Sequence, residues 1–256
     1  MLLIEVHRIR KLHPVIGGRK LYCMLQPFLL AHQIKIGRDA LFDLLAANKL
    51  LVRRRIRRPK TTHSQHWYRK YTNLTKDWQP SQPGQLWVAD ITYIDTMAGF
   101  LYLSLLTDAY SHKIVGFDIA KNLEAVNAIN ALKMALGNHL PVQPLIHHSD
   151  RGIQYCCNQY TTLLKQHDIR ISMTETGDPR DNAIAERING ILKHEYIKHF
   201  KIESVASAKT IIKAIVETYN GQRPHMSIQM NTPDTVHALN LQANRKWSNQ
   251  TQFTKL

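Results

Sequence analysis

The sequence predicts an α/β protein, in which a mixed β-sheet carries helices on its faces and a small basic helical region precedes it. Three observations predict this class. Strand-like and helix-like patterns follow one another in the order βββαβαβαα after residue 85. Residues 1–70 hold 16 of the 34 Lys and Arg residues but only 3 of the 19 Asp and Glu residues. Apolar residues make up 44% of the 256 residues, which is enough for a sizeable core.

The first region is predicted to be helical. Leu21 and Leu25 are spaced as on one helix face, a polar break follows at residues 33–38, and helical spacing resumes over residues 40–45. Two short helices around a tight break suit a helix-turn-helix, whose second helix enters the major groove of DNA, although helical hairpins without a DNA partner share this pattern. We therefore expect residues 1–62 to form a helix-turn-helix-like DNA-binding region.

A basic segment closes this region and is a candidate for contact with a nucleic-acid backbone. Clustered Lys and Arg side chains release counterions from phosphates, whereas a surface that only keeps a protein in solution usually mixes both charge signs. The aromatic residues Trp67, Tyr68 and Tyr71 follow the cluster, and residues 63–84 end in a proline-rich stretch that predicts a linker. The predicted DNA contacts in the cluster are Arg53, Arg54, Arg55, Arg57, Arg58 and Lys60.

The core is predicted to span residues 85–240, with a tail over residues 241–256. It begins with three strand-like runs that short turns connect into a meander. Helices then alternate with two short strands, and the loop before Asp181 leads into a long helix. The predicted strands are residues 86–95, 100–109, 112–120, 144–150 and 169–174, and further helices are predicted at residues 124–138, 158–168 and 204–221.

Composition excludes several classes of protein. No apolar run approaches the ~20 residues needed to cross a bilayer, and the amino terminus lacks the order of segments that marks a signal peptide. The three cysteines, two of them adjacent, offer neither a disulfide framework nor a CxxC zinc pair. We therefore expect a cytoplasmic protein with reduced thiols and no membrane partner.

Three acidic residues in separate elements are the candidates for catalysis. Asp90 lies inside the first predicted strand, where a carboxylate is unfavourable unless something compensates for it, Asp150 ends the fourth strand, and Glu186 lies on the first turns of the long helix. Cleaving a phosphodiester needs cations that neutralise the phosphate and activate the attacking oxygen, and Mg²⁺ prefers carboxylate oxygens. Singly, such acids are more often strand-edge or solvated helix residues, so the combination carries the prediction.

The long helix is predicted to present one polar and one apolar face. Lys193 follows Glu186 by seven residues, two helical turns, so both side chains project from one side, and Asn182 and Asn189 join them. The opposite face is predicted to pack on the sheet through Ile184, Ile188, Ile191 and Leu192. We assign His147 to packing and four other core acids to turns, strand ends and caps, namely Asp95, Asp108, Asp118 and Asp181.

Four segments of the chain together resemble one known family: WVADITYI, HHSDRGIQY, DNAIAERINGILKHEY and YNGQRPHMSIQMNTP. They are similar to the integrase-like transposases of bacterial insertion-sequence family three, specifically to the larger, catalytic OrfB-type product. The resemblance runs from about Gly17 to Pro233. Its most specific part is the set of three acids with 35 residues between the second and third and a basic residue seven positions later.

The resemblance implies a ribonuclease-H-like core in which Asp90, Asp150 and Glu186 are catalytic and hold two Mg²⁺ or Mn²⁺ ions. It implies hydrolysis that frees a 3′-hydroxyl at the end of the element, and then attack of this hydroxyl on another phosphodiester. Lys193 would contact the terminal phosphates. Three further residues would lie near the DNA and orient substrate or ligands, namely His148, Asn182 and Asn189.

The resemblance also implies the partners. These are double-stranded DNA (transposon ends and target), further copies of the chain on DNA, and a small OrfA-type companion protein, in the bacterial cytoplasm at the nucleoid. Two other functions stay open: a metal-dependent nuclease of the same fold that hydrolyses without joining, and a non-catalytic DNA-binding repressor or decayed copy. The basic first third of the chain weighs against the nuclease, and the intact set of three acids weighs against decay.

Overall fold

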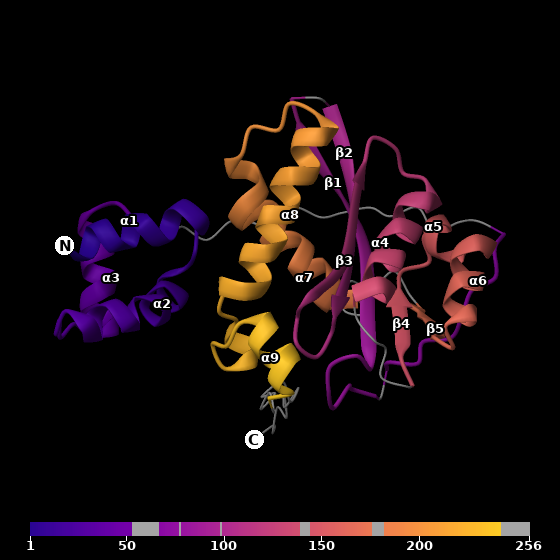
Figure 1. Ribbon diagram of the computed structural model, residues 1–256, viewed down its shortest axis with the longest axis horizontal. Coiled ribbons are helices and arrows are strands. Elements are labelled where there is room, and N and C mark those ends of the chain that lie inside the picture. Colours follow the sequence, from indigo (N-terminus) through magenta and orange to yellow (C-terminus); the bar gives the residue numbers. More distant parts are fainter. Residues whose placement is uncertain (53–66, 77, 98, 139–143, 176–181, 242–256) are drawn as a thin grey trace, which may run out of the picture.

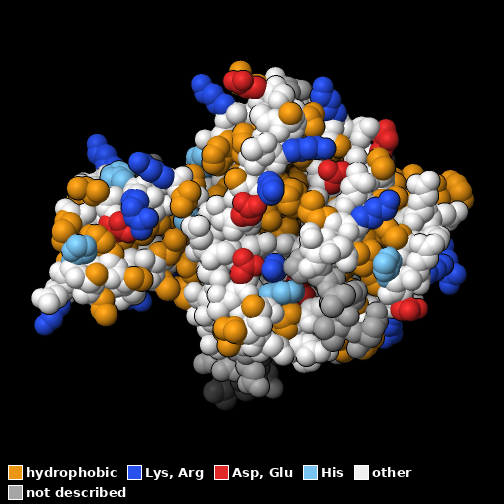
Figure 2. All heavy atoms as spheres, viewed as in Figure 1, with side chains coloured by type: hydrophobic (Ala, Val, Ile, Leu, Met, Phe, Trp, Pro, Cys, Tyr) orange, Lys and Arg blue, Asp and Glu red, His pale blue; other side chains and the backbone are white. Residues whose placement is uncertain are grey.

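The computed structural model describes residues 1–52, 67–76, 78–97, 99–138, 144–175 and 182–241. A domain of three helices lies beside an α/β core, as Figure 1 shows. On the face seen in Figure 2, the charged side chains of the helical domain are mainly Lys and Arg, whereas the core shows Asp and Glu among its Lys and Arg. Within the described ranges, no helix combines the length and the apolar character that crossing a bilayer requires.

The helical domain has its own hydrophobic core. It consists of α1 (Leu2–Leu12), α2 (Gly18–Ala31) and α3 (Arg38–Ala47). The side chains of Val6, Leu21, Leu25, Leu41 and Leu45 are fully buried among the three helices. The predicted polar break is the loop between α2 and α3, and α1 is an element that the spacing of apolar residues did not reveal. The six basic residues predicted to contact DNA, and most of the segment that carries them, lie outside the described residues.

The predicted linker packs against the core over its described part. Tyr68 and Tyr71 lie against the hydrophobic cluster of the core, and the backbone N–H of Leu74 donates to Ser172 Oγ at 2.9 Å. Trp67, by contrast, is 86% exposed. The partly buried rings of Tyr68 and Tyr71 therefore help to fix this part of the predicted linker on the core.

A five-stranded sheet in the order β3-β2-β1-β4-β5 forms the centre of the core. The predicted meander is confirmed: β1 (Leu86–Thr96), β2 (Gly99–Asp108) and β3 (Ile114–Ala120) pair in antiparallel fashion. The short strands β4 (Ile146–Ser149) and β5 (Arg170–Met173) extend the sheet in parallel pairing. Strand β1 lies in the middle and pairs with β2 on one side and β4 on the other.

Helices cover both faces of the sheet, as Figure 1 shows. One face carries α4, α5 and α6, and the other carries α7 and α8 with the short α9 at the end of the described chain. A π-helical turn extends α7 and a 3₁₀ turn follows it. The bounds are α4 (Ala125–Asn138), α5 (Ile153–Cys156), α6 (Asn158–Gln166), α7 (Ala183–Ile191), the π-helical turn (Leu192–Tyr196), the 3₁₀ turn (Ile197–His199), α8 (Val205–Gln222) and α9 (Pro233–Leu239).

Alternation along β1 decides which side chains face α7. Trp87 and Ala89 belong to the cluster under α4 and α6, whereas Leu86 and Val88 pack with Ala185 of α7. Because successive side chains of a strand point to opposite faces, Asp90 shares the α7 side of the sheet with Leu86 and Val88. This parity places a carboxylate under the helix that carries Glu186.

Candidate active site

Asp90 lies in β1, and Asp150 directly follows the last residue of β4, the strand that pairs with β1 in parallel. The register of β1 and β4 pairs Trp87 with His147 and Val88 with His148, so Asp90 and Asp150 each lie two residues beyond the last pair. Parallel strands are about 4.8 Å apart, and residues in register point to the same face. The structure therefore brings these two predicted ligands together at the end of β4, on the side of the sheet that α7 covers.

Helix α7 is anchored on β1 by two asparagines that flank Glu186. Asn182 Nδ2 donates to the carbonyl oxygen of Ala89 at 2.8 Å, and Asn189 Nδ2 donates to Asp90 Oδ2 at 2.8 Å. Glu186 is four residues after the first and three residues before the second, so all three lie on one face of the helix. The backbone of Glu186 is thus held beside Asp90, while its side chain is exposed to solvent.

Asn189 has a role that sequence reasoning missed. It was expected to contact DNA, but its side chain is only 2% exposed and it holds the carboxylate of Asp90 instead. The other oxygen, Asp90 Oδ1, accepts from the backbone N–H of Ile91 at 2.9 Å. The sequence signal for this role was that Asn189 shares a helix face with Glu186. The helical spacing could not show how closely this face approaches β1.

Tyr155 of α5, on the other face of the sheet from α7, interacts electrostatically with Asp90 and Asp150. Its hydroxyl is buried, and no hydrogen-bond partner for it lies in the described part of the chain. Burial raises the pKa of this hydroxyl far above its usual value, and the negative charges of Tyr160, Asp90 and Asp150 raise the pKa further. Tyr155 therefore lies near enough to Asp90 and to Asp150 for both carboxylates to act on its hydroxyl.

The donor set fits a hard divalent cation, although the side chains do not form a finished cluster. Among the residues that the structure describes, no three His, Cys, Asp or Glu side chains are grouped as ligands of one metal ion. Carboxylates that share a site repel one another until a cation binds. The available atoms are oxygens, as Mg²⁺ prefers, and the buried amide oxygens of Asn182 and Asn189 have no partner in the described residues.

Lys193 lies in the π-helical turn that continues α7 and reaches the same strand. Its ammonium group donates to the carbonyl oxygen of Tyr93 at 2.7 Å and lies 3.8 Å from the centroid of the Tyr93 ring. The predicted common face of Asn189 and Lys193 is present in the structure, since both contact β1. The apolar face also packs as predicted, with Ile188 and Leu192 buried against the sheet.

His148 is buried beside the site. It is 1% exposed, and its Nδ1 shares a hydrogen bond of 2.8 Å with Ser172 Oγ. Its ring lines a cavity of about 180 Å³ between α7 and the segment that precedes β1, with Trp78 and Asn182 among the lining residues. A direct contact of His148 with a DNA backbone stays a prediction that this burial does not favour.

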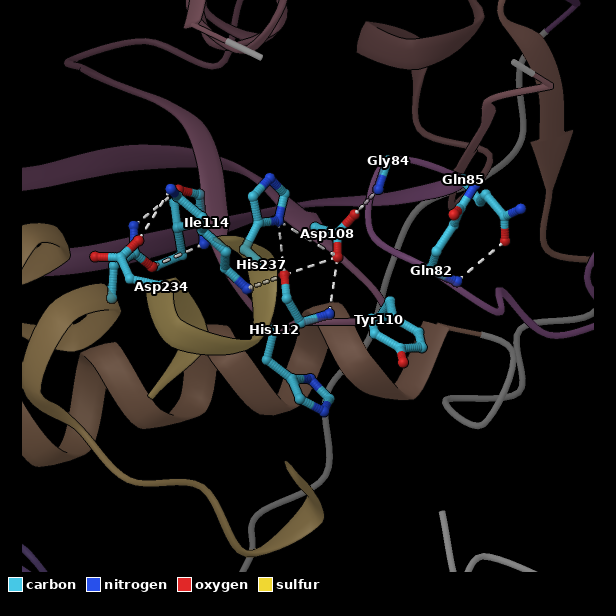
Figure 3. Close-up of polar contacts among 12 residues, drawn as sticks. Gln82, Gly84, Gln85, Asp108, Tyr110, His112, Ile114, Asp234 and His237 are labelled. Carbon is cyan, nitrogen blue, oxygen red and sulfur yellow. Dashed lines mark hydrogen bonds and ion pairs between the residues drawn. The ribbon is translucent and has the colours of Figure 1, made fainter. Parts of the chain in front are cut away.

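Asp108, the other acid at a strand end, has a structural role as expected. It is fully buried and accepts from the backbone N–H of Gly84 at 2.7 Å and from the N–H and hydroxyl of Ser111, both at 2.8 Å. Figure 3 shows Asp108 between Gly84 and His237 of α9, whose Nδ1 lies 3.9 Å from Asp108 Oδ1. This carboxylate therefore ties the start of β1, the turn after β2 and α9 together. Asp181 lies outside the described residues, and Asn182 occupies the N-cap of α7.

His147 packs as predicted. It is 1% exposed, and its Nε2 shares a hydrogen bond of 2.8 Å with the hydroxyl of Tyr160. Burial, and then the neighbouring His148, lower the pKa of His147 to about 3. The imidazole is therefore neutral near pH 7 and belongs to the core rather than to the site.

The chain is similar to known protein families. Two family models, each of an integrase core domain, match residues 80–179 and 167–233. The chain is 33% identical over 211 residues to the transposase for insertion sequence element IS629 of Shigella sonnei, covering 82% of this chain and 70% of the relative. It is 36% identical over 203 residues to a 31 kDa protein of insertion element IS600 from the same organism, covering 78% and 75%.

The fold and a further relative agree with these matches. The transposase InsF for insertion sequence IS3A of Escherichia coli is 38% identical over 154 residues, covering 59% of this chain and 53% of InsF. A simian T-cell lymphotropic virus intasome chain, solved by cryo-electron microscopy in complex with a PP2A regulatory subunit, superposes with a TM-score of 0.55 at 17% identity, over 91% of this chain and 74% of its own. The core thus has the ribonuclease-H-like integrase fold, and the chain belongs to the DDE transposases of insertion-sequence family three.

Proposed function

We propose that the chain cleaves and joins DNA at the ends of its insertion sequence, with Asp90, Asp150 and Glu186 as the ligands of divalent metal ions. Membership in a transposase family makes DNA the partner. The observation that supports the ligand set best is the register of β1 and β4, together with the two asparagines that hold α7 and Glu186 over Asp90.

The reaction we propose consists of two phosphoryl transfers. In the first, a water oxygen forms a bond to phosphorus and the bond from phosphorus to the 3′-oxygen breaks, which leaves a 3′-hydroxyl. In the second, this hydroxyl forms the new phosphodiester with another DNA strand and displaces the 3′-oxygen there. When bound, Mg²⁺ or Mn²⁺ neutralises the phosphate and lowers the cost of deprotonating the attacking oxygen.

The protein side chains prepare the site for these steps. Asn189 and the N–H of Ile91 each hold one oxygen of Asp90, and the N–H of Gly152 holds Asp150 Oδ1 at 2.9 Å. Each carboxylate oxygen has a second lone pair, so these hydrogen bonds orient the ligands without exhausting them. Lys193, in the π-helical turn that continues α7, supplies a positive charge for a phosphate of the bound strand.

Further features of the family resemblance are part of the proposal. We include two ions, assembly of several copies on DNA, a DNA-binding role for α1–α3 and the basic segment, an OrfA-type companion, and a cytoplasmic location. A trimeric form of the HTLV-2 integrase catalytic core domain in complex with magnesium superposes with a TM-score of 0.50 at 20% identity, over 61% of this chain and 97% of its own. That likeness shows the fold; magnesium belongs to the description of that protein.

The proposal is tested by incubating the purified chain with labelled duplexes that carry the terminal repeats of its element and Mg²⁺. Joined products support the transposase, cleavage without joining supports the nuclease, and retardation without chemistry supports the repressor. Asp150→Asn is expected to abolish cleavage and leave DNA binding intact, because it removes a ligand charge and no core packing. The matched control is Asp168→Asn, an exposed residue with φ of 54° that Asn also adopts. Cleavage by Asp150→Asn near the native rate would remove Asp150 from the site.

A further inference from the structure

The motif Arg223-Pro224-His225 follows α8 and forms a buried ion pair. Arg223 is 1% exposed, and its Nε and Nη2 donate to the two carboxylate oxygens of Glu195 at 2.9 and 2.8 Å. Its Nη1 lies 2.9 Å from His225 Nε2. Because a guanidinium only donates, this nitrogen of His225 accepts and the imidazole is neutral, in agreement with a pKa that burial and then Arg223 lower. A bidentate pair of this kind fixes the position and the plane of the carboxylate.

Glu195 belongs to the π-helical turn Leu192–Tyr196, the direct continuation of α7. The turn therefore shares one rigid stretch of backbone with Glu186 and also contains Lys193. A π-helical turn is rare and less favourable than an α-helical one, so it persists where surrounding contacts hold it. Arg223 supplies such a contact from the end of α8, and the position of Glu195 thereby affects how the last part of the catalytic helix lies on β1.

The helical domain contacts the same turn. His13, at the end of α1, shares a hydrogen bond of 2.8 Å between its Nδ1 and the hydroxyl of Tyr196, and both side chains are nearly fully buried. Lys20, on the first turn of α2, places its Nζ 3.8 Å from Glu195 Oε1. Glu195 thus lies between a cation of the core and a cation of the helical domain.

Burial and neighbouring charges determine the protonation of His13 and Lys20 in these contacts. Burial and the charge of Arg223 lower the pKa of His13 to about 4, so the contact of His13 with Tyr196 is between neutral groups near pH 7. Burial, and then Arg223, lower the pKa of Lys20 to about 8, while Glu195 acts in the opposite direction. The charge of Lys20 therefore depends on Glu195, the carboxylate that Arg223 holds.

Among the residues that the structure describes, none of the apolar clusters joins the helical domain to the core. Its own cluster draws on residues between Leu2 and Leu50, and the core clusters draw on residues from Tyr68 onward. Contacts between domains that are polar and few allow relative motion by default. The position of α1–α3 relative to the catalytic helix therefore depends strongly on His13 and Lys20.

We propose that His13, Lys20, Glu195, Tyr196 and Arg223 form an inter-domain clamp that sets the distance between α1–α3 and the helix carrying Glu186, and thereby selects which phosphodiester of a bound DNA end enters the active site. Only the selection of the phosphodiester rests on the proposed function. The docking of the helical domain on the core is a property of the protein without DNA. All five are positioning residues, since none of them is expected to touch the reacting phosphate.

The test uses the full chain with the paired change Lys20→Met and Tyr196→Phe. Both substitutions keep the apolar part of the side chain and remove the polar atom that crosses between the domains. The matched control is Lys11→Met, a substitution of an exposed lysine of the same domain. Small-angle X-ray scattering measures the docking, and cleavage of a labelled terminal-repeat duplex with Mg²⁺, mapped at nucleotide resolution, measures the selection of the phosphodiester.

The paired variant is expected to show a larger maximum dimension than the native chain and the control. On DNA it is expected to spread its cuts over neighbouring phosphodiesters, where the native chain makes one main cut. A scattering curve that superposes on the native curve would overturn the clamp. A larger dimension with an equally sharp cut would overturn its role in selection. A native chain that cuts no DNA would count against the proposed function, and scattering would still decide the docking.

Discussion

The hydrogen bond from Asn189 to Asp90 offers a test of how the fold prepares the site, through the substitution Asn189→Leu. The new side chain has nearly the same shape but donates nothing to Asp90 Oδ2, which Asn189 Nδ2 approaches to 2.8 Å. A hydrogen bond to a charged group contributes about 1.5–3 kcal/mol, and each 1.4 kcal/mol corresponds to about tenfold in rate. Loss of partners that orient metal ligands costs about 10–100-fold in metal affinity or activity. We therefore expect cleavage to fall by about 10–100-fold and the Mg²⁺ requirement to rise.

Stability is expected to change little in the same variant, which separates positioning from folding. Asn189 also buries an amide oxygen without a partner in the described residues, a cost of about 1–3 kcal/mol that leucine removes. This gain offsets the lost hydrogen bond, so the free energy of unfolding should stay within about 1 kcal/mol of the native value.

The assay measures the cleavage rate against Mg²⁺ concentration, with thermal unfolding of the same preparations. The control is Asn130→Leu, which removes the same kind of contact at an exposed position, since Asn130 Nδ2 donates to Asp118 Oδ2 at 3.0 Å. The control should cleave at the native rate. The reasoning is refuted if Asn189→Leu cleaves within about threefold of the native rate at an unchanged Mg²⁺ requirement, less than the ~10–100-fold loss expected of such a partner.

Two further predictions concern the core. At Gly116 of β3 an added Cβ would overlap the carbonyl oxygen of Ala131 on α4, so Gly116→Ala should lower the free energy of unfolding by about 1–3 kcal/mol and Tm by several degrees. In the control Gly137→Ala the added Cβ meets nothing within 4 Å, so this variant should be neutral or stabilising. Equal melting temperatures of the two variants would contradict this close packing. Burial lowers the pKa of His147 to about 3, against about 6.5 in the unfolded chain, so below pH 6.5 the unfolded state takes up a proton that the folded state excludes. Stability should therefore fall between about pH 6 and 4, and His147→Gln should flatten this fall by up to one proton, about 1.4 kcal/mol per pH unit; an unchanged slope would show that His147 is protonated in the folded state.

The first two strands of the sheet could be predicted because they are long and regular. Alternation over residues 86–95 and 100–109 located β1 and β2 to within about one residue of their ends. The third strand begins at Ile114 rather than at 112, because His112 adopts a left-handed conformation with φ of 63° in a turn held by Asp108. Short elements such as α5 and α9 escaped because one or two turns leave little apolar periodicity.

The functional residues divide in a similar way. Spacing along one helix placed Glu186, Asn189 and Lys193 on a common face, but it did not predict that this face approaches β1 closely enough to bury Asn189. Arg223 and Glu195 are 28 residues apart and meet through the packing of α8 beside the π-helical turn, which no local pattern indicates. Asp90, Asp150 and Glu186 could be proposed as a set from the sequence because metal-dependent phosphoryl transfer demands acids from separate elements.

Anomalous diffraction from crystals of the full chain grown with Mn²⁺ tests the central claim most directly, because it locates the metal without reference to activity. We expect a Mn²⁺ peak between the carboxylates of Asp90 and Asp150, with the side chain of Glu186 turned toward it and ligand distances of about 2.0–2.3 Å. Ordered Mn²⁺ at other positions, with the carboxylates of Asp90 and Asp150 bare at saturating metal, would contradict it.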